Sequence, residues 1–90
     1  MADVDKRLQQ AIIEVVNTQI KSNDPPETRQ TFERLLHEGF SEAETLKLIG
    51  YVVATEVFAV FKDNRQYDGK KFVSALKNLP SLPWDKEESG

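Results

Sequence analysis

Several residue types that would support chemistry are absent or scarce in this 90-residue sequence. It contains no cysteine, which excludes a disulfide framework and a thiolate metal site. It contains a single histidine, His37, and its four glycines form no phosphate-binding loop. These absences leave little material for metal ligation, thiol chemistry or nucleotide binding, and we expect no cofactor.

Long hydrophobic runs are also missing. The most apolar stretch, LKLIGYVVATEVFAVF at residues 46–61, is interrupted by Lys47 and Glu56. A membrane-spanning helix needs about 20 predominantly apolar residues. The first ten residues, MADVDKRLQQ, lack the apolar centre of a signal peptide. We therefore expect a soluble cytoplasmic protein with no membrane partner.

The composition that remains is that of a small globular domain. Hydrophobic residues make up 39% of the chain and charged residues 30%. We expect one helical domain over residues 1–84 and a disordered acidic tail over residues 85–90. Leu82 and Trp84 are expected to pin the start of this tail to the domain.

The net charge of −3 is unevenly distributed. Residues 24–44 carry six acidic and two basic side chains, a net of −4, whereas residues 62–79 carry five basic and two acidic side chains, a net of +3. The acidic segment disfavours general nucleic-acid binding, and the basic segment keeps local nucleic-acid binding open. The two segments could equally face each other, within one molecule or between two.

Apolar spacing and capping signals predict four helices. The first runs from about Asp3, a candidate cap, to Ser22, and its main apolar stripe includes Leu8, Ile12 and Val15. The second begins near "DPPE", with Asp24 as the expected N-cap, Pro25 at the first helical position and a capping box completed by Glu27.

Gly39 is expected to end the second helix in a left-handed conformation, with Phe40 folding back on its last turn. Ser41 and Glu44 have the spacing of a capping box for the third helix, which should reach Phe61 or Lys62. Its strongest apolar face carries Leu46, Ile49, Val53, Val57, Val60 and Phe61.

Asp68 is the expected cap of a fourth helix, Gly69 to Asn78, which Pro80 follows. No segment shows the sustained alternation of a strand. The predicted fold is all-α, a compact bundle of four helices packed around the long apolar third helix.

Three short helices are not expected to cover every side of the third. An apolar patch should remain around Leu48, Tyr51 and Phe58, and exposed patches of this kind commonly mark association surfaces. The wide apolar stripe of the first helix adds a rim of Ile13, Val16 and Ile20 together with Val4. The favoured function is thus a non-catalytic interaction module that binds a second copy or another protein.

Glu56 is the one candidate for buried chemistry, because it lies at the flank of the apolar face of the third helix. One interpretation is a general acid–base or ligand-binding carboxylate. The other, which we favour, is an ion pair or a tyrosine hydrogen bond at the edge of the core, or a solvent-facing flank. No second carboxylate lies one turn away on the same face, which argues against a paired-carboxylate site in this helix. The serines have no local partner set and the single histidine is a poor base for them, so the chain is not expected to be an enzyme.

Two other features suggest ligands only weakly. His37 follows Glu33 by four residues, but metal binding would need further donors, so we expect a surface histidine and no metal. Nucleic-acid or phosphate binding is the alternative function, through a basic patch at the last loop and helix. Its members are Lys62, Arg65, Lys70, Lys71 and Lys77, with Tyr67 available to stack on a base.

Two stretches, NDPPETRQTFERLLHEGFSEAETLKLIG and FKDNRQYDGKKFVSALKNLP, resemble a group of small bacterial helical domains of unknown function. The shared features are a Pro-Pro-Glu-Thr entry at residues 25–28, a Gly-aromatic-Ser-Glu-x-Glu turn at residues 39–44 and an Ala-Leu-x-x-Leu-Pro close at residues 75–80. The resemblance covers about residues 23–80. It implies a helical fold and brings no activity to any residue.

Overall fold

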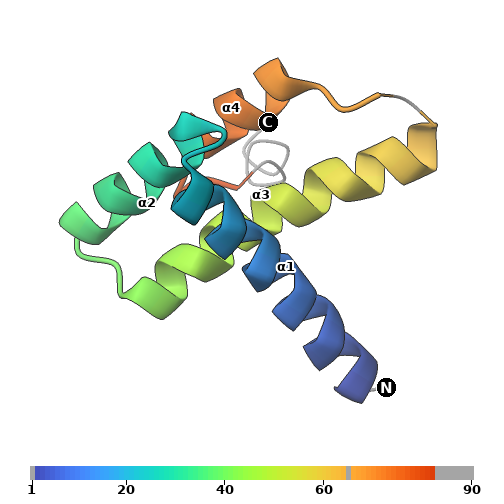
Figure 1. Cartoon of the computed structure of the whole chain (residues 1–90), viewed down its shortest axis with the longest axis horizontal. Coiled ribbons are helices and arrows are strands. Elements are labelled where there is room, and N and C mark those ends of the chain that lie inside the picture. The colour runs from blue at the N-terminus through green and yellow to red at the C-terminus, as the bar shows by residue number, and fades with distance from the viewer. Residues whose placement is uncertain (1, 65, 83–90) are drawn as a thin grey trace.

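The computed structural model describes residues 2–64 and 66–82, and within them the fold is all-α. Four helices follow one another: α1 (Ala2–Ser22), α2 (Pro26–His37), α3 (Glu42–Asp63) and α4 (Gly69–Asn78) (Figure 1). This confirms the predicted four-helix bundle. None of these helices is long and apolar enough to span a membrane. Arg65, Trp84 and the predicted tail at residues 85–90 lie outside the described residues.

The start of α2 differs from the prediction. Its N-cap is Pro25, in an extended conformation and without a side-chain capping bond, and Pro26 is the first helical residue. The residue before a proline is disfavoured in the helical conformation, so Pro26 keeps Pro25 out of the helix. Asp24 as the N-cap was therefore wrong by one position.

The turn between α2 and α3 follows the predicted signals. Gly39 adopts a φ of +106°, and the amide of Phe40 donates to the carbonyl of Leu35 at 3.1 Å, which closes the last turn of α2. Ser41 then accepts a hydrogen bond from the amide of Glu44 at 3.1 Å, and the Glu44 carboxylate accepts one from the amide of Ser41 at 2.9 Å. These caps fix where α2 ends and where α3 begins.

The cap of α4 also follows the prediction. The carboxylate of Asp68 accepts hydrogen bonds from the amides of Lys70 and Lys71 at 3.1 and 3.2 Å. Phe72 and Leu76 then face inward and are buried, as a helix with apolar residues four apart requires. The capped helix thus brings two large side chains to the core.

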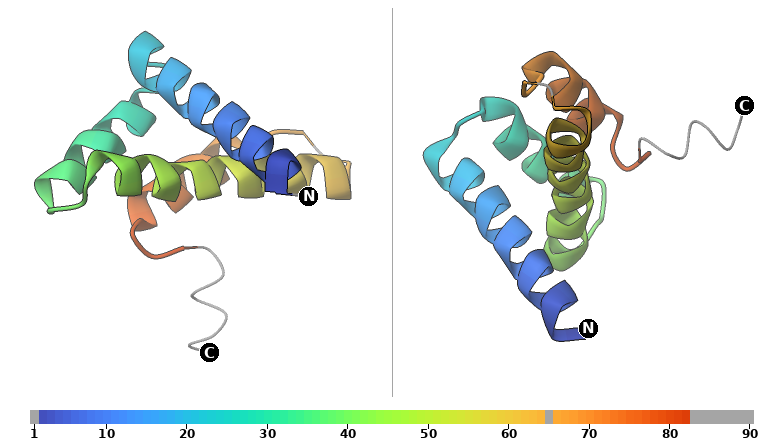
Figure 2. Two further views of the ribbon diagram at one scale, coloured as in Figure 1. Left: turned by 90° about the horizontal axis from the view of Figure 1, so that it is seen from below. Right: turned by 90° about the vertical axis from the view of Figure 1, so that its right-hand side faces the viewer.

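The core lies where α2 and α3 meet the other helices. Both α2 and α3 contact every other helix, whereas α1 and α4 do not contact each other within the described residues. The third helix is therefore not the only central one. Figure 2 (left) shows α1, α2 and α3 as the sides of a triangle, with α4 packed behind. The buried apolar side chains are Val16, Leu35, Ile49, Val52, Val53, Phe72, Leu76 and Leu79, and half-buried Leu82 packs against them.

The first helix crosses the third at Gly50. A side chain there would meet Ile12, since a Cβ atom placed on Gly50 would lie 3.2 Å from Cγ2 of that residue. The missing side chain lets the two helices approach closely. Beyond this crossing the N-terminal half of α1 projects away from the other helices (Figure 1), and Leu8 is 60% exposed.

The crossing changes which residues of α1 face the core. Val16, predicted at the rim of an interaction surface, is completely buried, and Ile12 and Ile20 pack beside it. Val15, predicted in the main stripe, is instead 44% exposed. The inward face therefore follows Ile12, Val16 and Ile20, which recur every four residues, because only that face meets both α2 and α3.

One arginine ties α2 to the end of α4. The guanidinium of Arg34 donates to the backbone carbonyls of Leu76 and Leu79 at 3.2 and 2.9 Å, and to the carboxylate of Glu38 at 2.8 Å. A cation beside the last carbonyls of a helix satisfies groups that have no partner in the helix and complements its dipole. The sequence pattern did not reveal this contact, which joins positions 42 and 45 residues apart.

We expect Arg34→Ala to lower the free energy of unfolding by about 2 kcal/mol, because it removes charge-assisted hydrogen bonds to backbone carbonyls of α4. Arg34→Lys should recover only part of the loss, since lysine cannot reproduce the planar fork of donors. Arg29→Ala is the matched control, because Arg29 forms only an exposed pair with Glu33 on the same helix. Urea unfolding followed by circular dichroism measures the free energy of unfolding of all three variants. Equal losses of this free energy for Arg34→Ala and Arg29→Ala would contradict a stabilising contact between Arg34 and the end of α4.

Candidate functional site

Three surfaces carry the residues singled out from the sequence. They are the exposed side of α3, a cleft between α4 and the α1–α2 turn, and an apolar pocket beside Glu56.

The exposed side of α3 carries large aromatic residues. Phe58 is 68% exposed, Phe61 80% and Tyr51 43%, while Leu48 is half-buried against the core. In Figure 2 (right) α1 and α2 lie on one side of α3, and α4 lies on the other at the upper end of the view. The predicted exposure of Tyr51 and Phe58 is confirmed. Phe61, expected to face inward, is the most exposed of the three.

A groove runs beside this exposed side, between α1 and the N-terminal half of α3. It has a volume of about 200 Å³, and its walls are mostly apolar. Leu8, Ile12 and Ile13 line it from α1, and Leu46, Tyr51 and Ala54 from α3. The structure therefore brings Ile13 and Tyr51 together, as an association surface requires. It leaves Ile20 out of the groove, packed against the core.

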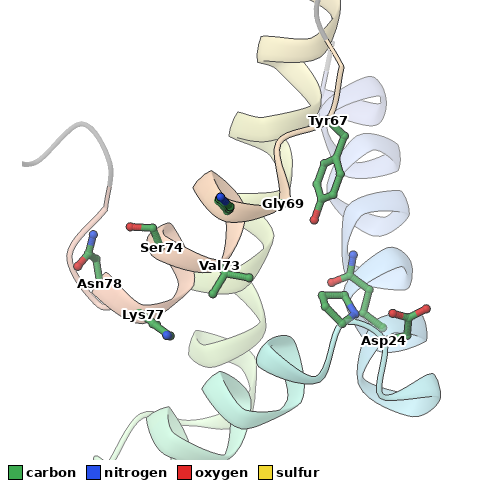
Figure 3. Close-up of a pocket in the computed structure, with 10 residues that line it drawn as sticks. Asp24, Tyr67, Gly69, Val73, Ser74, Lys77 and Asn78 are labelled. Carbon is green, nitrogen blue, oxygen red and sulfur yellow. The ribbon is translucent and has the colours of Figure 1, made fainter.

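The cleft beside α4 carries charges of both signs. Figure 3 shows Tyr67 reaching from the α3–α4 loop toward the α1–α2 turn, with Ser74 and Lys77 on α4 across from it. The cleft is open to solvent and has a volume of about 1060 Å³; Lys70 and Lys77 line one side, and Asp24 lies on the other. An anion in this space would meet a carboxylate as well as two ammonium groups.

Two of the four described members of the predicted basic patch line the cleft. These are Lys70 and Lys77; Lys62 lies in the last turn of α3, and Lys71 is not among the lining residues. The anion-attracting start of α4 is already occupied, because Asp68 accepts the hydrogen bonds of the Lys70 and Lys71 amides. Both observations reduce the support for phosphate or nucleic-acid binding.

Glu56 is buried, with 8% of the residue exposed, as its place beside the apolar face suggested. Its Oε1 atom accepts a hydrogen bond from the backbone amide of Asp68 at 3.3 Å. A buried carboxylate needs such donors to offset its lost hydration. Glu56 thus holds the loop that leads into α4, which supports the structural interpretation over the catalytic one.

The pocket beside Glu56 is small and apolar. It has a volume of about 300 Å³, and Val15, Val57, Val60, Phe61 and Phe72 supply most of its walls. Gln19 and Tyr67 are its polar neighbours, and the Gln19 side chain accepts a hydrogen bond from the buried hydroxyl of Thr28 at 2.9 Å. Thr28 lies on α2, so this bond joins α2 to α1, and no local sequence signal revealed it.

Tyr67 lies among acidic groups. Burial raises the pKa of its phenol above the ordinary value of 10.0, and the negative charges of Glu56, Glu27, Asp24 and Asp68 raise it further. The phenol is therefore neutral near pH 7 and cannot serve as a base there.

No metal centre is present in the part of the chain that the structure describes. His37 is exposed in the last turn of α2, and no group of three or more potential ligand residues gathers among these residues.

Comparison with protein-family models, curated proteins and solved structures found no match. The resemblance to small bacterial helical domains therefore stays a prediction.

We expect Glu56→Ala to lower the free energy of unfolding by about 1–3 kcal/mol, because the amide of Asp68 loses a buried acceptor. Glu56→Gln retains an amide oxygen that can accept, so its loss should be clearly smaller. Glu14→Ala and Glu14→Gln are matched controls at an exposed position of α1. Denaturant unfolding measures the four variants, and equal losses for the two Glu56 variants would show that the acceptor is not what matters.

The raised pKa of Tyr67 predicts a loss of stability at alkaline pH. As the pH rises, the phenol of the unfolded chain ionises first, so the contribution of Tyr67 is fully present below about pH 10 and is lost as the pH rises through the folded pKa. Tyr67→Phe should therefore flatten the fall in unfolding free energy above pH 10. Unfolding measured from pH 8 to 11 tests this, and an unchanged slope would contradict it.

Proposed function

We propose that this protein is a non-catalytic interaction module that associates with itself through the exposed side of α3. The observation that carries the proposal is the exposure of Phe58 and Phe61, 68% and 80%, on a helix whose opposite face is buried. Burying an aromatic side chain contributes about 1.5–3 kcal/mol, so two such residues on one helix give association a substantial driving force.

The shape of the surface supports this proposal. The groove between α1 and α3 lies beside the exposed aromatic residues. Six apolar or aromatic side chains line it, including Ile13 and Tyr51. A partner surface with projecting aromatic residues would fit such a groove, and the same chain carries these residues. Exposed apolar surface next to a groove is a common property of protein interfaces.

The other two surfaces support chemistry less well. Glu56 is engaged by the backbone of the α3–α4 loop, and the α4 cleft places Asp24 across from Lys70 and Lys77. Neither surface combines a nucleophile with a base or gathers cations without a nearby carboxylate. We therefore infer a binding role and no catalytic one.

Sedimentation equilibrium over a wide concentration range tests the proposal. The wild type should self-associate with a dissociation constant of roughly 1–100 µM, a range suited to a small interface. Phe58→Glu should shift the chain to monomer, because a carboxylate replaces an aromatic side chain at the centre of the surface. The proposal would be overturned by a wild type that stays monomeric at every concentration up to about 1 mM.

Leu36→Glu is the matched control. It also places a carboxylate on an exposed apolar position, because Leu36 is 37% exposed, but on α2 and outside the proposed surface. Association should survive in this variant. Equal dissociation of both variants would show that added charge, and not the exposed side of α3, controls the association.

A further inference from the structure

The exposed side of α3 repeats with the spacing of a coiled-coil seam. We define the seam as Glu44, Leu48, Tyr51, Thr55, Phe58 and Lys62, which follow one another at intervals of four, three, four, three and four residues. Leu48 is half-buried and the other five are exposed. This alternation keeps a stripe of side chains facing a partner helix along its whole length.

The charges at the two ends of the seam are opposite. Glu44 lies in the first turn of α3 and Lys62 in the last, with only uncharged residues of the seam between them. Two copies that align α3 in the same direction would place like charges together at both ends. Two copies that run in opposite directions would pair Glu44 of each copy with Lys62 of the other.

One antiparallel register matches every position of the seam. With the two-fold axis at the level of Val53, Leu48 faces Phe58 of the second copy and Tyr51 faces Thr55. Glu44 faces Lys62 in the same register, because the two numbers of each pair have the same sum (44 + 62 = 48 + 58 = 51 + 55). Lys47, the remaining charge beside the seam, falls level with Ala59 and meets no like charge.

The groove fits the same register. Its α3 wall runs from Leu46 to Ala54, in the N-terminal half of the helix, on the flank of the seam that also carries Phe61. In an antiparallel pair related by a two-fold axis, the same flank of α3 faces the same side of the dimer in both copies. The C-terminal half of one α3 lies beside the N-terminal half of the other. Phe58 and Phe61 of the second copy therefore lie beside the groove. The most exposed aromatic residues thus meet the apolar hollow that this chain provides.

We propose that a second copy of this chain binds along α3 in antiparallel orientation, with Glu44 of each copy paired to Lys62 of the other and Phe61 seated at the α1–α3 groove. This inference rests on the proposed self-association and adds its geometry. The interface is isologous, so each contact occurs twice.

Charge reversal tests the register. Glu44→Lys and Lys62→Glu should each weaken self-association by roughly tenfold, because each places two like-charge pairs across the interface. The double variant restores both pairs and should return the dissociation constant to within about threefold of the wild type. An equimolar mixture of the two single variants should form a heterodimer more tightly than either forms a homodimer.

Glu44→Gln is the control for folding. The Glu44 carboxylate also accepts the amide of Ser41, and glutamine can take that place in a capping box while removing the charge. It should weaken association less than Glu44→Lys. Unfolding free energies of all variants separate a loss of folding from a loss of association.

Cysteine cross-linking is the second measurement, and the natural chain adds no competing thiol because it contains no cysteine. A mixture of Glu44→Cys and Lys62→Cys chains should form a disulfide-linked heterodimer on mild oxidation. Either variant alone should not, because the antiparallel register separates identical positions by about 27 Å, the rise over the 18 residues between positions 44 and 62.

The outcomes separate the two proposals. The antiparallel pair is supported if the double charge-reversal variant regains the affinity of the wild type and the mixture of Glu44→Cys and Lys62→Cys chains forms a disulfide. Cross-linking of each variant with itself, or single reversals without effect in a chain that Phe58→Glu still dissociates, would overturn the register and leave self-association standing. A wild type that is monomeric at every concentration would overturn both.

Discussion

The close crossing of α1 over α3 at Gly50 is the constraint on which the rest of this structure depends. The absence of a side chain at Gly50 lets Ile12 reach the backbone of α3, and this contact fixes which face of α1 turns inward. Helices that cross at an angle separate on both sides of the contact. The C-terminal half of α1 therefore encloses a core with α2, while its N-terminal half leaves a groove. The exposed side of α3 lies away from its buried residues, which include Ile49, Val52 and Val53.

Local signals made much of the fold predictable from the sequence. Ser41, Glu44, Asp68 and Gly39 act on backbone groups a few residues away, so their spacing alone identifies the caps. Asp24 shows the limit of this approach. Its capping spacing was satisfactory, but the steric effect of Pro26 on the residue before it decided where α2 begins.

Contacts between distant segments were harder to foresee. The rotation of α1 depends on one close approach to α3, so Val16 was placed at a surface although it is completely buried. Phe61 was assigned to the inward face of α3 because its spacing fits that face, but it is 80% exposed. Tyr51 and Phe58 were identified correctly because on the helical wheel they fall outside the strongest apolar face of the helix. Arg34 was missed, since its partners are backbone carbonyls and no residue type at Leu76 or Leu79 reveals them.

The polar anchors of α4 have a consequence for how the chain folds. This helix has ten residues, too few to be stable alone in water. The residue that caps it, Asp68, is held through its amide by Glu56 of α3, and its C-terminal end is held by Arg34 of α2. Both anchors come from helices that precede it in the chain, and they lie in place only when α2 and α3 are packed together. The fourth helix is therefore expected to form last, on a template that the first three helices have completed.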